Sequence, residues 1–255
     1  MASENRWSRF EDNENSWFSL WSEARDTGCA LLLLNENLAD DPVFNHATRV
    51  RCEPQEADDL IGRTISQFRE KSIPPCFYVS PFTSPEDFGE RLGDKGFREW
   101  DRMDVMEYVG GEPPSYEGDL EIHRVGLESM KIWTSVFTES FEIPLSQAQE
   151  YVKRSRHLFP RSDTDFILTY VDGKVAGCAA LYSKNRVGGV YSLGILAEFR
   201  RMGVASNMLK AAVRLSEERH NDTLILQALR QDGLEEFYSR NSFEKAYTKS
   251  IYILR

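Results

Sequence analysis

One stretch decides the fold: Leu193-Gly194-Ile195-Leu196-Ala197-Glu198-Phe199-Arg200-Arg201-Met202-Gly203-Val204-Ala205-Ser206. It starts with apolar residues typical of a buried strand and continues through a basic, glycine-bearing turn. The turn opens a segment, residues 204–219, whose apolar side chains repeat at helical spacing. We therefore expect a strand, a turn and the N-terminus of a long helix.

A phosphate site is expected at this helix start. The first N–H groups of a helix lack partners within the helix and carry partial positive charge, so a pyrophosphate can satisfy them. Gly203 lets the backbone come close to the ligand, and Ala205 leaves the first turn uncluttered. Arg200 and Arg201 are expected to add positive charge at the rim.

The spacing of Arg200, Gly203 and Ala205 resembles the signature of the GNAT superfamily of acyl-CoA N-acyltransferases. The resemblance extends over residues 120–255 in the order of the elements. It implies an α/β (α+β mixed sheet) protein with the GNAT fold, built as two lobes around a mixed central sheet flanked by helices. It also implies acetyl-CoA, or another acyl-CoA, as the co-substrate, with no metal.

The same resemblance implies roles for single residues. Backbone groups of Leu193 and Ile195 would face the pantetheine arm and the thioester carbonyl. A Tyr at the place of Tyr238 lies near the CoA sulfur, often as the general acid for the departing thiolate. The family often has Asn at the place of Gln231 and Gly at the place of Ser242. The full set implied to bind the cofactor is Leu193, Gly194, Ile195, Arg200, Arg201, Met202, Gly203, Val204, Ala205, Ser206 and Gln231.

Acyl transfer to an amine needs three roles: a base for the amine, a donor to the oxyanion and an acid for the thiolate. Backbone N–H groups near Ile195 suit the oxyanion, and Tyr238 suits the sulfur. The predicted strand carries no Glu or His, which leaves Glu139, Glu142, Tyr191 or a water relay for the base. We expect an N-acetyltransferase that works by direct attack in a ternary complex. The alternative is a non-catalytic acyl-CoA sensor or scaffold.

Hydrophobic patterns predict the other elements of the second lobe. An Asp172-Gly173 turn indicates a hairpin, because Asp-Gly supplies the positive backbone angles of a tight turn. Asn241 is expected at a left-handed helix end. The patterns predict strands at residues 120–125, 166–171, 175–182, 190–196, 224–228 and 246–254, and helices at 127–139, 147–157, 204–219 and 234–240.

The first lobe partly repeats this order. A strand near 48–51, a helix at 55–71, a strand at 76–80, a helix capped by Ser84 and a strand at 98–108 are predicted. Glu53 and Glu56 precede its long helix, where acidic side chains would repel phosphate, so only the second lobe is expected to bind nucleotide. The predicted domains are residues 1–112, a degenerate GNAT-like lobe, and 120–255, the GNAT N-acetyltransferase domain, joined by a linker at 109–119.

Composition narrows the partners. A net charge of −10 disfavours nucleic acid and favours a cationic acceptor, expected to be a small-molecule or peptide amine. Four scattered cysteines indicate reduced thiols in a cytoplasmic protein rather than a disulfide framework or a metal site. The apolar run at residues 29–34 is too short for a membrane span and fits a buried strand. Residues 1–15 are expected to fray. The resemblance to the GNAT superfamily also makes a homodimer an open expectation.

Overall fold

The computed structural model describes residues 2–111, 120–159 and 161–255. Seven α-helices are assigned in these residues: α1 Ala2–Ser19, α2 Ala57–Glu70, α3 Phe88–Asp94, α4 Met130–Ser140, α5 Leu145–Leu158, α6 Val204–Glu218 and α7 Glu235–Arg240. The strands are β1 Glu23–Asp26, β2 Leu31–Leu34, β3 His46–Thr48, β4 Cys76–Val79, β5 Arg98–Tyr108, β6 Leu120–Val125, β7 Thr164–Val171, β8 Lys174–Lys184, β9 Val187–Ile195, β10 Thr223–Leu229 and β11 Phe243–Ile253. Four 3-10 turns complete the list: η1 Glu36–Leu38, η2 Leu127–Ser129, η3 Ala197–Phe199 and η4 Arg230–Asp232.

All these strands belong to one mixed sheet, in the order β1-β2-β3-β4-β11-β5-β10-β9-β8-β7-β6. Strands β6 to β9 form an antiparallel meander. Strand β3 runs parallel to β4, and β9 runs parallel to β10. The predicted α/β class with a mixed sheet flanked by helices is confirmed.

The chain packs into two compact units, and both are discontinuous in sequence. The α6 unit comprises Met1–Glu14, Met106–Gln227 and Glu235–Glu244, and the α2 unit comprises Asn15–Val105, Ala228–Leu234 and Lys245–Arg255. Strands β5, β10 and β11 each begin in one unit and end in the other. The predicted segments 1–112 and 120–255 stay a prediction, and residues 112–119 of the predicted linker lie outside the described residues.

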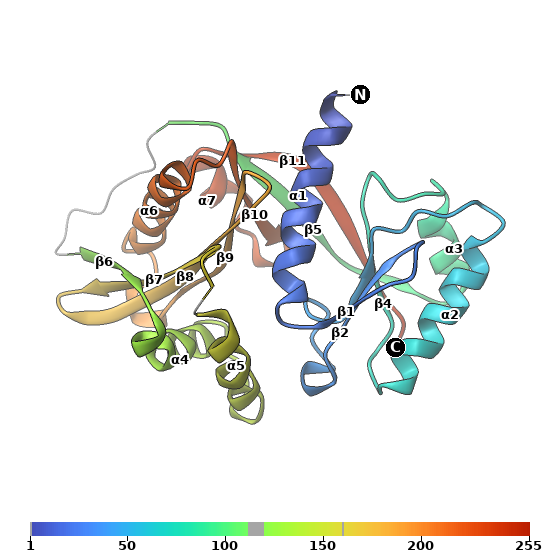
Figure 1. The fold of residues 1–255 in the computed structure, drawn as a ribbon, viewed down its shortest axis with the longest axis horizontal. Helices are drawn as coiled ribbons and strands as arrows, with labels where there is room; N and C mark the ends of the chain where they lie inside the picture. Colours follow the sequence, from blue (N-terminus) through green and yellow to red (C-terminus); the bar gives the residue numbers. More distant parts are fainter. Residues whose placement is uncertain (1, 112–119, 160) are drawn as a thin grey trace. The chain divides into compact units, whose positions relative to one another are not determined.

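In the α6 unit, α4 and α6 lie on opposite faces of the β7–β9 meander (Figure 1). Consecutive residues of β7 serve the two faces, as the period of a strand requires. Phe166 contacts Trp133 of α4, whose indole N–H donates to the Ala179 carbonyl. Ile167 belongs to the cluster that packs against α6. Trp133, on the helix predicted at residues 127–139, therefore belongs to the core.

In the α2 unit, helices α2 and α3 and strands β2 and β4 share one core. Phe77 of β4 makes edge-to-face contacts with Phe88 and Phe97, at centroid distances of 5.4 and 5.5 Å. Apolar residues of α2, such as Ile61 and Phe68, complete this cluster. The element order β3-α2-β4-α3-β5 agrees with the strand and helix order predicted for the first lobe.

Two cap predictions are wrong. Helix α3 begins at Phe88, with Asp87 as its N-cap, and Ser84 instead donates its hydroxyl to the Cys52 carbonyl. At the end of α7 the left-handed residue is Ser242, with φ of +65°, rather than Asn241. Asn241 is buried, and its amide donates to the Phe237 carbonyl one turn earlier.

The prediction that residues 1–15 fray is also wrong, because α1 covers them from Ala2 onward. Phe10 is fully buried, and so are the polar residues Glu11, Asn13 and Glu14. The helix lays polar side chains against the sheet at positions where an amphipathic pattern would place apolar ones. For this reason the sequence of α1 lacks the apolar periodicity that predicts an amphipathic helix.

Among the described residues, no helix has both the length and the apolar character that crossing a bilayer requires.

Candidate functional site

The turn between β9 and α6 has the conformation of an open anion site. Arg201 and Gly203 both take positive φ, of 64° and 80°, and Gly203 is the N-cap of α6. A non-glycine residue in this region costs about 1 kcal/mol, so the turn is held in its shape by its surroundings. Arg201, Met202 and Gly203 are exposed, whereas Val204 and Ser206 are buried.

The first turn of α6 is free of competing groups. The N-cap makes no side-chain hydrogen bond, and the first turn carries no acidic residue. The first hydrogen bond within the helix runs from the Asn207 N–H to the Gly203 carbonyl, at 3.2 Å. The N–H groups of Val204, Ala205 and Ser206 precede it and lie at the positive end of the helix dipole. By contrast, the first turn of α2 holds Asp58 and Asp59, so the charge difference predicted between the lobes is present.

Arg200 is exposed and its guanidinium hydrogen-bonds to two backbone carbonyls, while its predicted positive charge at the rim stays a prediction. Its Nε donates to the Ile195 carbonyl at 3.1 Å, and its Nη2 donates to the Ser140 carbonyl at 2.9 Å. The guanidinium thus joins the end of β9 to the C-terminal end of α4. The next residue, Arg201, is also exposed.

Strand β9 carries a bulge just before the turn. Its register with β8 shifts between the pairs Ala180–Tyr191 and Cys178–Gly194, so β9 has one extra residue there. Ser192 takes a φ of +53° at this point. A bulge leaves backbone groups outside the ladder. Pairing of β9 with β10 ends at Val190 opposite Leu226, while β9 runs on to Ile195.

The predicted strand residues offer backbone rather than side chains. Leu193 and Ile195 pack their side chains against the cluster that holds Val204 and Met208 of α6. A Cβ added to Gly194 would lie 2.7 Å from the Ser140 Cβ, so glycine here lets the end of α4 approach the strand. Leu193, Gly194 and Ile195 can therefore offer a ligand main-chain groups rather than side chains.

Tyr238 lies on α7 and is mostly buried, at 8% exposure. Its ring makes edge contacts with Phe237 and Phe243, at centroid distances of 5.2 and 6.4 Å. The α6 unit contains Tyr238, whereas Gln231 lies on η4 in the α2 unit, with its N–H directed at Asp101. Ser242 stands where the family often has Gly, and its positive φ explains that preference.

The residues considered for the base differ in their surroundings. Glu139 and Glu142 are exposed. Tyr191 is buried, and its hydroxyl donates to Asn13 Oδ1 at 2.7 Å. Burial, and then the charge of Glu14, raises the pKa of Tyr191 well above its ordinary value. The Tyr191 hydroxyl therefore keeps its proton near neutral pH and is no base.

Sequence reasoning missed Asn13 and Glu14, both supplied to the α6 unit by α1. The available signal was weak: Phe10 and Trp17 are seven residues apart, two turns of one helix face, and polar residues fill the positions between them. The amide side chain of Asn13 and the carboxylate of Glu14 interrupt the apolar stripe on that face. Their burial follows from packing against β9, which no local pattern reports.

Two of the four cysteines, Cys76 and Cys178, are buried. All four are free thiols, and burial raises the pKa of Cys76 and Cys178. A thiol kept protonated is a poor nucleophile. The described residues contain no group of three or more His, Cys, Asp or Glu side chains suited to a metal ion.

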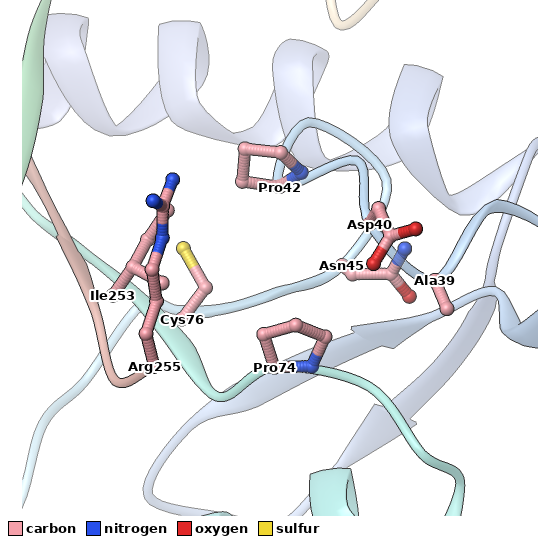
Figure 2. A pocket seen from close by; sticks show the side chains of 8 residues that line it. All are labelled: Ala39, Asp40, Pro42, Asn45, Pro74, Cys76, Ile253 and Arg255. Carbon is pink, nitrogen blue, oxygen red and sulfur yellow. The ribbon is translucent and has the colours of Figure 1, made fainter.

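A separate cavity of about 340 Å³ lies within the α2 unit (Figure 2). It is lined by Asp40, Asn45, Cys76 and Arg255, among others, and by none of the predicted site residues. The Asn45 amide already donates to the Leu38 and Asp41 carbonyls. This cavity has no part in the site at the β9–α6 turn.

Comparison with known proteins agrees with the fold. A GCN5-related N-acetyltransferase from Kribbella flavida superposes with a TM-score of 0.73 at 17% identity, over 96% of this chain and 94% of that one. A conserved protein of unknown function from Staphylococcus epidermidis gives a TM-score of 0.68 at 14% identity, over 91% and 92%. A GCN5-related N-acetyltransferase from Sphaerobacter thermophilus gives 0.65 at 14%, over 89% and 76%.

No curated protein matches the chain. The model of the acetyltransferase (GNAT) family matches residues 130–243, a segment that runs from the start of α4 to the start of β11 and contains the β9 bulge, the turn and α6. This segment, residues 130–243, is therefore similar in sequence to the acetyltransferase (GNAT) family, and the solved structures agree with it in fold.

Proposed function

We propose that this chain is an N-acyltransferase that moves an acetyl or other acyl group from acyl-CoA to a primary amine. The acceptor, a small molecule or a peptide, attacks the thioester directly while both substrates are bound. Acyl-CoA is the co-substrate, and the chemistry needs no metal.

One observation carries the proposal: in the family-matched segment, a bulged strand is followed after a short turn by a helix start that has no capping side chain and no acidic residue. The N–H groups of Val204, Ala205 and Ser206 suit a pyrophosphate, which needs several donors and positive potential. The bulge at Ser192 and Leu193 offers backbone groups to a pantetheine arm and a thioester carbonyl. Arg200 lies between these two features and donates hydrogen bonds to the Ile195 carbonyl of β9 and the Ser140 carbonyl of α4.

The reaction assigns a task to each part. As the amine nitrogen attacks, the thioester oxygen gains negative charge, which backbone N–H groups at the bulge stabilise. The bond to sulfur then breaks, and the thiolate takes a proton from the Tyr238 hydroxyl. Water, or an exposed carboxylate such as Glu139 or Glu142, receives the amine proton.

A second function is an acyl-CoA sensor that keeps the nucleotide site and lacks turnover. Two observations favour it. Strand β9 carries no carboxylate, and the pKa of Tyr191 is raised, so neither supplies a base. Ser242 and Gln231 also depart from the residues common in the family.

The test of the donor site is acetyl-CoA binding, measured by calorimetry and thermal shift on the native protein and on Gly203→Glu. Glutamate places a negative charge where the pyrophosphate would lie, and we expect binding to be lost. Gly173→Glu is the matched control. Gly173 also has positive φ, at +72°, its added Cβ would meet nothing within 4 Å, and it lies in the hairpin turn.

Gly173→Glu carries the same strain and charge, and it should bind acetyl-CoA like the native protein. Loss of binding in both variants would point to a general folding defect, which the melting temperature detects. A native protein that binds neither acetyl-CoA nor longer acyl-CoAs would overturn the proposal.

A further inference from the structure

Asn13 of α1 inserts its side chain into the β8–β9 hairpin. Its Oδ1 accepts the hydrogen bond from the Tyr191 hydroxyl, at 2.7 Å. Its Nδ2 donates to the Val187 carbonyl at 2.8 Å and to the Tyr182 carbonyl at 3.3 Å. Asn13 is fully buried, so one side chain satisfies three polar groups away from water.

Gly189 makes this contact possible. A Cβ at Gly189 would lie 2.4 Å from Asn13 Oδ1 and 2.4 Å from Tyr191 Cε2. Real Cβ atoms do not approach that closely, so a side chain here would displace Asn13 or the tyrosine ring. The glycine is therefore required for space, on the face of β9 that α1 covers.

Tyr191 is the last residue of β9 in register before the bulge. Its hydroxyl donates a hydrogen bond to Asn13 Oδ1. The next residue, Ser192, takes the positive φ that creates the bulge. Holding the ring of Tyr191 thus holds the backbone from which the bulge departs.

Helix α1 is itself fixed to this unit by ion pairs. Arg9 donates to the Asn185 carbonyl at 2.6 Å and pairs with Asp222 at 3.0 Å. Arg6 pairs with Glu107 of β5. These contacts lie on β5, on the β8–β9 turn and beside the start of β10, so they anchor the part of α1 that belongs to the α6 unit.

We infer that Asn13 is a positioning residue for acyl transfer, which sets the backbone geometry of the β9 bulge through Tyr191. This inference rests on the proposed function, because it assigns the bulge to the thioester. It adds a role for α1, which lies outside the family-matched segment. Misplacing oxyanion donors by about 1 Å can cost a hundredfold in rate.

The test compares Asn13→Ala, Tyr191→Phe and the double variant with the native protein. Each single variant should lower kcat by roughly tenfold to a hundredfold. The KM for acetyl-CoA should stay within about twofold, because the turn at α6 is untouched. The double variant should be no slower than the slower single one, since both act through one hydroxyl contact.

Asn45→Ala is the matched control. Asn45 is also buried, also donates its amide to two backbone carbonyls, and also accepts one hydrogen bond, from the Asn35 N–H, but it lies in the α2 unit. It should lose similar stability and keep its kcat. Tyr191→Phe removes a single oxygen and keeps the inference testable if Asn13→Ala fails to fold.

Amide hydrogen exchange gives a readout that needs no turnover. Peptides covering residues 191–195 should exchange faster in Asn13→Ala and Tyr191→Phe than in the native protein and in Asn45→Ala. Unchanged exchange, or a kcat loss in Asn45→Ala equal to that in Asn13→Ala, would overturn the inference while the proposed function stands. A native protein without acyl-CoA binding would overturn the proposed function, and the role of Asn13 in catalysis with it.

Discussion

The role of Tyr238 distinguishes the two proposed functions, an acyltransferase and an acyl-CoA-binding protein without turnover. Its ring packs against Phe237 and Phe243, so a purely structural role is the competing explanation. Phenylalanine keeps that packing and removes only the hydroxyl. The two explanations therefore differ in what this substitution does to rate.

For Tyr238→Phe we expect kcat to fall by roughly a hundredfold to ten-thousandfold, because a general acid for the thiolate is lost. Acetyl-CoA affinity, measured by calorimetry, should stay within about twofold. Steady-state rates against a panel of primary amines give the comparison. An unchanged kcat would assign Tyr238 to the core.

Residues of the candidate site could be predicted from the sequence only where they form a pattern of close spacing along the chain. The spacing of Arg200, Gly203 and Ala205 located the turn, and Gly203 has the positive φ that only glycine takes easily. The partners of Arg200 on α4 were not predictable, because Ser140 is 60 residues away in sequence. Gly189 and Gly194 are likewise explained by neighbours on α1 and α4 that no local window contains.

At the scale of elements, α6 is held at both ends. Arg200 fixes the turn at its start, and at its C-terminal end Arg219 pairs with Asp165 of β7. Asp165 is fully buried and also pairs with Arg124 of β6. A buried carboxylate with two guanidinium partners sets the distance between the helix and the meander.

Asp165→Asn should lower the free energy of unfolding by about 3 kcal/mol, since it leaves Arg219 without its buried partner charge. Urea denaturation followed by tryptophan fluorescence measures the loss. Asp59→Asn is the control: Asp59 pairs with Arg63 on the exposed face of α2, and its loss should cost less than about 0.5 kcal/mol. Equal losses in the two variants would contradict a structural role for the buried pair.

The strands and helices of residues 120–255 were predicted almost to their ends, because apolar residues recur there at a period of two or 3.6. Strand β5 was predicted at its observed limits, Arg98–Tyr108. Helix α1 was not, because Asn13 and Glu14 face the sheet. Polar side chains that are satisfied only by distant strands give no periodic signal.

At the scale of the whole molecule, His46 links stability to pH. It is fully buried, stacks on Tyr78 at 3.8 Å, and its Nδ1 lies 3.0 Å from the Pro42 carbonyl. Burial lowers the pKa of His46 to about 3, with smaller effects from its surroundings. The unfolded chain, with an ordinary histidine pKa near 6.5, binds the proton more readily between these two values.

Stability should therefore be fully present above about pH 6.5 and fall as the pH drops toward 3, by on the order of 1.4 kcal/mol per pH unit from this one group. In His46→Phe that contribution disappears, so its stability should change less between pH 6.5 and 4.5. Urea titrations at several pH values give the two slopes. His220 is exposed, so His220→Gln should keep the native dependence of the free energy of unfolding on pH. If His46→Phe showed the same pH dependence as the native protein, His46 would not be the responsible group.

Three strands, β5, β10 and β11, begin in one compact unit and end in the other. Cleaving the chain at a unit boundary would therefore interrupt a strand. A fragment of residues 120–255 would lack β5 and α1. Without Asn13 of α1, the buried Tyr191 hydroxyl would lose its hydrogen-bond acceptor, and its side chain would become exposed to water. Neither half is a module that a gene fusion could transplant intact.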